Sequence, residues 1–255
     1  GIYYNLSEND HTASVVDNGH QPYKGEVIVP ESFTNVDGQE YTVTSVGRQA
    51  FNKCFDLNSV VLPSTVTNIE ERAFFNCPSL VSVTMPAVTS FGEGAFIYCS
   101  GLQAVELPEG TTAVSENMFS GCSSLESVTL PSTVNSIGNT AFGGCTALTI
   151  LNVKAENVPQ CSADAFTDID KEKCTLNIVS GTEVKYQNAE GWKDFTNIIG
   201  KYAGVESVAN DGVNVMASDG IINVIGVREG QPVEVYNVSG QLLYSGNDTT
   251  ISIAV

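Results

Sequence analysis

Seven cysteines and two histidines are the side chains of this 255-residue chain best suited to nucleophilic, redox or metal chemistry. A thiolate can attack a carbon or bind zinc, and two close thiols can form a disulfide. Five of the thiols, however, recur at nearly constant spacing, namely Cys54, Cys77, Cys99, Cys122 and Cys145. No two cysteines stand in a C-x-x-C arrangement, so a zinc site is weakly supported. We therefore expect a column of small buried thiols. Whether Cys161 and Cys174, which lie outside the row, form a disulfide is left open.

Other catalytic patterns are missing from the sequence. His11 and His20 both lie near the N-terminus, which leaves few places for a Ser-His-Asp or Cys-His site. The sequence contains no glycine-rich phosphate loop, no H-E-x-x-H and no EF-hand pattern. Asp168 and Asp170 could contact a cation, but a solvated loop is the expected role of their segment. We predict that the chain is not an enzyme and has no catalytic residue, metal site or cofactor.

The cysteine spacing is one part of a longer repeat. A phenylalanine stands three residues before each of the five cysteines, and a sixth follows, so that steps of 23, 22, 23, 23 and 24 residues separate Phe51, Phe74, Phe96, Phe119, Phe142 and Phe166. Leucine, valine and proline keep fixed distances from these residues in the unit V-x-x-I-x-x-x-A-F-x-x-C-x-x-L-x-x-V-x-L-P. Self-similarity at such a period indicates a solenoid.

One unit is too small to fold alone. Burying a large apolar side chain contributes roughly 1.5–3 kcal/mol, whereas ordering each residue costs about 1–2 kcal/mol of backbone entropy. Stacked units share apolar faces and backbone hydrogen bonds. The alternation in L-x-x-V-x-L predicts one short parallel strand per unit, which the proline ends. We expect V-x-x-I to be extended and A-F-x-x-C to be a short helical or turn segment.

The units at 66–87 (VTNIEERAFFNCPSLVSVTMPA) and 134–153 (VNSIGNTAFGGCTALTILNV) are similar to BspA-like leucine-rich repeats of bacterial surface proteins, often from the Bacteroides group. The resemblance covers about residues 43–200. It implies a right-handed, β-rich α/β solenoid in a non-enzymatic, exported protein with a role in adhesion. It also implies an extracellular or cell-surface location.

The repeat predicts three parts of the chain. Residues 1–42 are expected to be an N-terminal β cap, with a strand ending at Pro30 and a turn at Asp37-Gly38. Residues 43–200 are the solenoid, in which about 174–200 replace a further coil with a closing segment. That segment is predicted to contain a helix with Tyr186 and Trp192. We expect Trp192 to cover the last coil, and stacking on a sugar is the alternative.

Residues 201–255 change character. Apolar and polar residues alternate between expected turns at Asp219-Gly220, Glu229-Gly230 and Ser239-Gly240. This pattern predicts a small antiparallel β-domain. Its VEVYNVSGQLLYSG segment resembles the C-terminal β-sandwich domains of exported Bacteroidetes proteins, and the domain is expected to be incomplete.

The charge of −18 comes from 29 acidic and 11 basic residues, and it argues against a nucleic-acid partner. It is explained either by solubility or by an acidic face for a cationic partner or divalent ions. No run of 18 apolar residues occurs, so no transmembrane segment is predicted. No signal peptide is recognisable, so composition alone fits either a cytoplasmic protein or a mature fragment without its leader.

The expected binding surface is the outward side of the L-x-x-V-x-L strands. Its predicted residues are small, polar and mildly acidic: Asn58, Ser82, Thr84, Gln103, Glu106, Glu126, Ser127, Thr129 and Asn152. Polysaccharide sites generally need aromatic platforms, which these positions lack, so we expect an extracellular or cell-surface protein partner, centred on Glu106, Glu126 and Thr129. A face that serves only solubility and a glycan-binding accessory protein are the alternatives. The chain is expected to act as a monomer.

Overall fold

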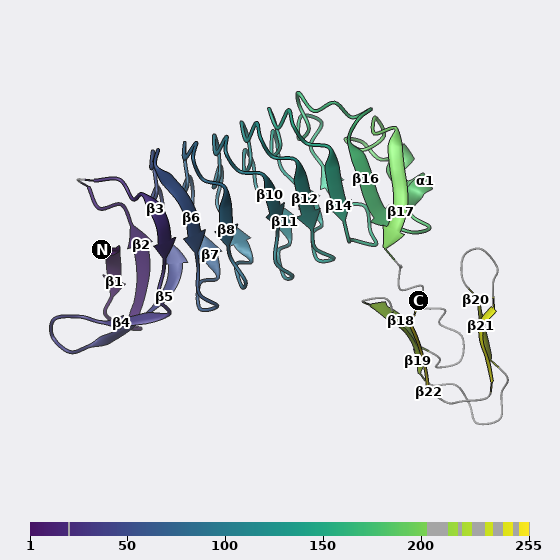
Figure 1. Cartoon of the computed structure of the whole chain (residues 1–255), viewed down its shortest axis with the longest axis horizontal. Helices are drawn as coiled ribbons and strands as arrows, with labels where there is room; N and C mark the ends of the chain where they lie inside the picture. The colour runs from purple at the N-terminus through teal and green to yellow at the C-terminus, as the bar shows by residue number, and fades with distance from the viewer. Residues whose placement is uncertain are drawn as a thin grey trace. The chain divides into compact units, whose positions relative to one another are not determined.

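The computed structural model describes residues 1–19, 21–202, 214–218, 221–225, 233–236, 242–246 and 250–254. It divides into two compact units, Gly1–Gly200 and Lys201–Val255. The first unit is a β-solenoid of about seven turns in which one coil stacks on the next (Figure 1). The predicted stack of repeats is thus confirmed at the level of a β-solenoid.

One side of each coil is a parallel strand, and these strands form two sheets. The first sheet contains β3 (Gly25–Ile28), β6 (Leu57–Val61) and β8 (Ser82–Thr84). The second contains β10 (Ala104–Glu106), β12 (Ser127–Leu130), β14 (Ile150–Val153), β16 (Thr175–Val179) and β17 (Asn197–Tyr202). Equivalent repeat positions face one another, so Val128 lies between Val105 and Leu151. The L-x-x-V-x-L segments are therefore strands in register.

The V-x-x-I segments form shorter strands on a second side of each coil. Here β7 (Asn68–Ile69) and β9 (Ser90–Phe91) continue a sheet from the N-terminal cap. A separate sheet contains β11 (Ala113–Val114), β13 (Ser136–Ile137) and β15 (Gln160–Cys161).

The A-F-x-x-C segments are turns and contain no helix. In each of them the phenylalanine N–H donates to a carbonyl of the following coil, as from Phe74 N to Ala95 O at 2.8 Å and from Phe119 N to Ala141 O at 2.8 Å. An α-helix needs the same N–H for a carbonyl four residues earlier in its own segment. The hydrogen bonds between coils therefore decide between the two forms that the sequence left open.

The six repeat phenylalanines form a continuous column at the centre of the solenoid. Neighbouring ring centroids lie 4.8–5.5 Å apart, and the ring planes deviate from parallel by 3–13°. Each ring is at most 3% exposed. Offset stacking of this kind adds to the free energy of burial. Because every ring touches the next, the column joins all the coils into one core.

The repeat cysteines reinforce this column by donating thiol hydrogen bonds across coils. Phe96 O accepts the Cys99 N–H of its own coil at 3.1 Å and the Cys122 Sγ of the next coil at 3.2 Å. The same thiol contact recurs from Cys77, Cys99 and Cys145 to the phenylalanine carbonyl of the preceding coil, at 2.9–3.2 Å. All seven cysteines are free thiols, including Cys161 and Cys174. The row of repeat cysteines thus has a structural explanation.

The N-terminal cap is made of β1 (Tyr3–Ser7), β2 (Thr12–Val16), β4 (Ser32–Thr34) and β5 (Glu40–Val46). Tyr23 packs on Phe51, the first ring of the column, at 4.9 Å. The expected turn is present, because Gly38 has φ +83° and its N–H donates to Asn35 O at 3.1 Å. Since β3 pairs in parallel with β6, the segment before Pro30 also acts as the first coil of the strand side.

The C-terminal end differs from the prediction in two respects. Residues 174–200 do not simply replace a coil, because β16 pairs with β14 in the repeat register. Helix α1 (Glu183–Asn188) contains Tyr186 but ends before Trp192, which lies in the following turn. Trp192 is fully buried against Phe166, with centroids 5.2 Å apart, and its Nε1–H donates to Pro159 O at 2.9 Å. Trp192 therefore covers the last coil, as predicted, and is not available to a sugar.

The second unit contains antiparallel strands. β19 (Ile221–Ile225) pairs with both β18 (Asn214–Ser218) and β22 (Thr250–Ala254). A separate pair joins β20 (Val233–Tyr236) to β21 (Leu242–Gly246). The turns expected at Asp219-Gly220, Glu229-Gly230 and Ser239-Gly240 lie outside the described residues.

Replacing Phe96 by alanine should lower the free energy of unfolding by about 3–5 kcal/mol, because the change opens a cavity in the middle of the ring column. Urea unfolding of the whole chain measures this. Phe55→Ala is the matched control: Phe55 is 52% exposed, and its loss should change stability far less. Equal losses of unfolding free energy in the two variants would contradict a large contribution of the ring column to stability.

Stability should fall as the pH rises above about 9. Burial raises the pKa of Cys145 from 9.0 to about 12 and that of Cys174 to about 11. Between the unfolded and folded pKa values, the folded chain keeps protons that the unfolded chain releases. Each such thiol therefore lowers the free energy of unfolding by about 1.4 kcal/mol per pH unit. Urea unfolding between pH 8 and pH 11 measures the slope, and Cys145→Ala should make it shallower. An unchanged slope would be the contrary result.

Candidate functional site

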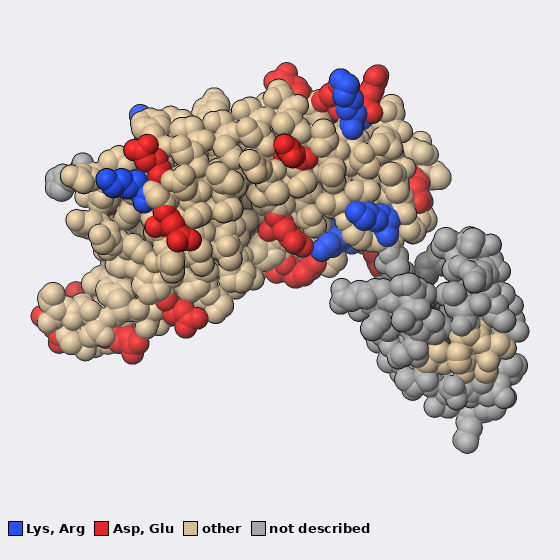
Figure 2. Space-filling model, in the orientation of Figure 1, with Lys and Arg blue, Asp and Glu red and all other residues tan. Residues whose placement is uncertain are grey.

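The outward side of β6, β8, β10, β12, β14 and β16, here called the strand face, is the broadest candidate surface. These strands lie toward the viewer in Figure 1, and the same view in Figure 2 shows a largely uncharged surface. All nine predicted residues lie on this face. The exposed ones are Asn58, Ser82, Thr84, Gln103, Glu106 and Glu126, and the half-buried ones are Ser127, Thr129 and Asn152. Their alternation with buried residues follows from the two-residue period of a strand.

A ladder of polar side chains crosses three strands of this face. Asn152 Nδ2 donates to Thr129 Oγ1 at 3.0 Å, and Asn177 Nδ2 donates to Asn152 Oδ1 at 2.8 Å. We call Thr129, Asn152 and Asn177 the amide ladder. Because Asn177 is only 7% exposed, its amide depends on this contact. The ladder fixes the side chains in one arrangement and leaves the half-buried members at the surface.

Sequence reasoning missed Asn177. The signal was present, because Leu176-Asn177-Ile178 repeats the Leu151-Asn152-Val153 pattern of the preceding strand. The Leu176-Asn177-Ile178 pattern was hard to recognise because the repeat loses its usual Phe-Cys-Leu spacing before β16.

The three residues expected at the centre of the site, Glu106, Thr129 and Glu126, have different partners. Glu106 forms an ion pair with Lys154, whose Nζ lies 3.1 Å from Glu106 Oε1 although the two residues are two coils apart. Thr129 belongs to the amide ladder. Glu126 is exposed, and within the described part of the chain no cation forms an ion pair with its carboxylate. Of the three, Glu126 alone offers an uncompensated charge to a partner.

A shallow groove interrupts the strand face between β8 and β10, where its two sheets meet. It is lined by Val83, Thr84, Met85, Pro86, Glu106, Leu107, Pro108, Glu109 and Lys154. The interruption coincides with a shorter coil: Pro86 and Pro108 are 22 residues apart, whereas the flanking proline pairs are 23 apart. The groove brings Thr84 and Glu106 together from different sheets.

The described residues include no group of three or more His, Cys, Asp or Glu side chains that could hold a metal ion. His11 is exposed, and His20 lies outside the described residues. Asp170 is paired with Lys173 at 2.6 Å, and this hydrogen bond lowers the pKa of the exposed Asp170 carboxyl. Asp168 is an exposed turn residue with φ +66°. Local turn structure accounts for Asp168 and Asp170.

Residues 30–149 match the family model described as "BspA type Leucine rich repeat region", in six copies. The match covers the coils of β6, β8, β10 and β12 and ends directly before β14. This region is thus similar to BspA-type leucine-rich repeats, and the matching family is one of repeat proteins.

Solved structures similar to the BspA-type array come from several bacteria. A leucine-rich-repeat protein of T. pallidum is 28% identical, with a TM-score of 0.52 over 59% of this chain and 67% of that one. A leucine-rich cell-surface protein of Faecalibacterium prausnitzii is also 28% identical, with a TM-score of 0.45 over 62% of this chain and 54% of that one. The matched region thus spans between about half and two thirds of these two proteins. No curated protein matches the chain.

Removing the central amide of the ladder should destabilise the array without disturbing its core. Asn152→Ala leaves the buried Asn177 amide without its acceptor, which costs about 1–3 kcal/mol. Gln103→Ala, on the same face but fully outside the ladder, should change stability by no more than about 0.5 kcal/mol. Chemical unfolding of both variants tests this, and an Asn152→Ala loss as small as that of Gln103→Ala would rule out a structural role for the ladder.

Proposed function

We propose that this chain is a non-enzymatic interaction protein that holds a protein partner on the strand face of its BspA-type array. The observation that carries the proposal is the amide ladder beside the unpaired Glu126. Together they present fixed hydrogen-bonding groups and one free charge on neighbouring strands. Arrays of this kind recognise partners over an extended surface formed by many coils.

The chemistry of the face favours a protein over a sugar. Interfaces between proteins use about one hydrogen bond per 100–200 Å² across a broad area, which suits rows of Ser, Thr, Asn and Glu. The outward strand positions from Asn58 to Asn152 include no aromatic side chain. A glycan-binding accessory role for this face therefore has no stacking platform to support it.

The proposal has finer parts. We infer an adhesin-like role, an extracellular or cell-surface location, an origin in the Bacteroides group, a right-handed coil and a monomeric chain. None of the helices in the described residues is long and apolar enough to cross a bilayer. The antiparallel strands after residue 201 support a small β-sandwich-like C-terminal domain as a third part of the chain, after the cap (1–42) and the solenoid (43–200).

Charge reversal at the centre of the face should weaken partner capture. We expect Glu106→Lys combined with Glu126→Lys to lower the affinity at least tenfold, because a partner that complements these carboxylates presents positive charge there and would be repelled by the two lysines. The test is surface binding to a panel of extracellular-matrix and cell-surface proteins. Glu116→Lys is the control, since Glu116 is exposed but lies outside the strand face. Binding that survives the double reversal, or is lost equally with the control, would exclude this face.

A further inference from the structure

The outer edge of β1, in the N-terminal cap, is a sheet edge without a partner strand. In the described part of the chain β1 pairs with β2 alone, in antiparallel register from Tyr3 opposite Val16 to Ser7 opposite Thr12. Figure 1 shows β1 at the N-terminal end of the stack, next to β2. An unpaired edge of this kind is a template for a further strand.

The backbone groups that point away from β2 are those of Tyr4 and Leu6. Residues opposite each other in an antiparallel pair either both point their N–H and C=O toward the partner or both point them away. Val15 O accepts the Gly47 N–H at 2.8 Å on the β5 side, so Val15 points away from β1. Its partner Tyr4 therefore points away from β2, and so does Leu6, two residues further. These are the hydrogen-bonding groups that an added strand would meet.

The same edge leaves part of an apolar face uncovered. Tyr4 and Leu6 lie opposite the buried Val15 and Ala13, so their side chains continue the inward face of the sheet. Tyr4 is half-buried and stacks on Phe33 with centroids 4.2 Å apart, whereas Leu6 is 38% exposed. A further strand would cover both residues with the side chains at its alternate positions.

β1 lacks the charges and prolines that usually protect a sheet edge. Its five residues, Tyr3 to Ser7, include neither. By contrast β3, which ends the other sheet at this end of the solenoid, contains Glu26 and is followed closely by Pro30. Natural proteins use charged side chains and proline on edge strands to prevent pairing with another chain. The edge of β1 is therefore open to pairing.

The cap around this edge is strongly acidic. Residues 1–42 contain seven Asp and Glu residues and one basic residue, Lys24. Three of the acidic side chains are exposed at the two ends of the β1–β2 hairpin: Glu8 and Asp10 in its turn, and Asp17 directly after β2 at the opposite end. Within the described residues, none of the carboxylates of the cap forms an ion pair. Negative charge thus lies at both ends of β1.

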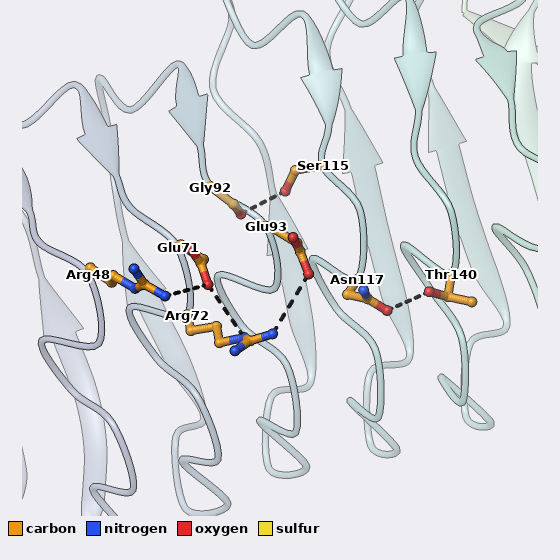
Figure 3. Close-up of polar contacts among 8 residues, drawn as sticks. All are labelled: Arg48, Glu71, Arg72, Gly92, Glu93, Ser115, Asn117 and Thr140. Carbon is orange, nitrogen blue, oxygen red and sulfur yellow. Dashed lines mark hydrogen bonds and ion pairs between the residues drawn. The ribbon is translucent and has the colours of Figure 1, made fainter.

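The cations of the following coils do not neutralise the cap. The two arginines bind carboxylates of the coils: Arg48 contacts Glu70 and Glu71, and Arg72 contacts Glu71 and Glu93. Figure 3 shows the guanidinium groups turned toward Glu71 and Glu93. Lys24 and Lys53 are the other basic residues before position 93, and two lysines do not balance the seven carboxylates of the cap. A partner with positive charge is the one that complements this end of the array.

We propose that the edge of β1 binds an extended, basic peptide segment of a partner protein by strand addition. The peptide pairs its backbone with the outward N–H and C=O groups of Tyr4 and Leu6, and apolar side chains at every second position cover these two residues. Lysine or arginine at its ends meets Glu8, Asp10 and Asp17. Backbone pairing supplies affinity, and the alternate side chains supply specificity. β1 belongs to a different sheet from the strand face, so the two sites are separate.

The test is titration calorimetry of the whole chain with a synthetic peptide of alternating valine and threonine that carries two lysines at each end. A peptide with glutamates in place of the lysines should bind roughly tenfold more weakly or worse. So should a peptide with the same lysines but N-methylated at every valine and threonine. This second peptide keeps the charge and loses the backbone donors, so it separates strand addition from general attraction to an acidic protein. In the complex, the Tyr4 and Leu6 amides should exchange with deuterium more slowly.

Variants of the chain place the peptide on β1. Leu6→Pro should weaken binding roughly tenfold or more while the chain stays folded, because the N–H that it removes points away from β2. Should this variant fail to fold, Leu6→Lys places a charge on the edge and should weaken binding as well. Glu8→Lys combined with Asp17→Lys should also weaken it. Glu116→Lys combined with Asp164→Lys is the matched control, since it makes the same change of charge at exposed residues of later coils.

Three results would overturn the proposal: no binding of the basic peptide, equal binding of its N-methylated form, and binding that Leu6→Lys leaves intact. Dimers of the chain that Leu6→Lys dissociates, seen by analytical ultracentrifugation without peptide, would assign the edge to a second copy instead. Failure of the peptide site leaves partner capture by the strand face untouched, because the charge reversals at Glu106 and Glu126 that test that face lie on other residues.

Discussion

Contact between successive coils is the constraint on which the rest of the structure depends. No coil has a core of its own, since the repeat phenylalanines pack on one another from coil to coil in one continuous cluster. The same neighbours supply the acceptors for its backbone N–H, and the next coil's cysteine thiol binds its carbonyl. Stability is therefore a property of the stack. The two ends need closing residues, which Tyr23 and Trp192 provide.

This constraint explains why cysteine suits the position after the ring column. A thiol is small enough to stack every coil, apolar enough to be buried, and still able to donate to a carbonyl that already accepts one N–H. Burial raises the pKa of the Cys122 and Cys145 thiols, so these stay protonated and unreactive. A residue type that first indicates redox or metal chemistry is used here for packing.

Because the core occupies the inward positions, function is left to the outward ones, and these differ between sides of the coil. On the strand face, neighbouring side chains are close enough to bind one another, which produces the amide ladder and the Glu106–Lys154 pair. Along the A-F-x-x-C turns, side-chain size changes abruptly from Tyr98 to Gly121. A solenoid can thus present surfaces of different chemistry on one rigid stack.

The period of the repeat, visible in the sequence, determined the solenoid, the burial of the Phe and Cys columns, and the set of residues that face outward from the strands. These follow because burial at a fixed spacing depends on residue type alone. Only the tertiary structure decided that A-F-x-x-C is a turn, that Asn177 extends the ladder, that Lys154 pairs with Glu106 and that a groove opens beside the short coil. Each of these depends on contacts between residues 21 to 48 positions apart. Such contacts are set by how coils align and how far side chains reach, which the repeat pattern does not specify.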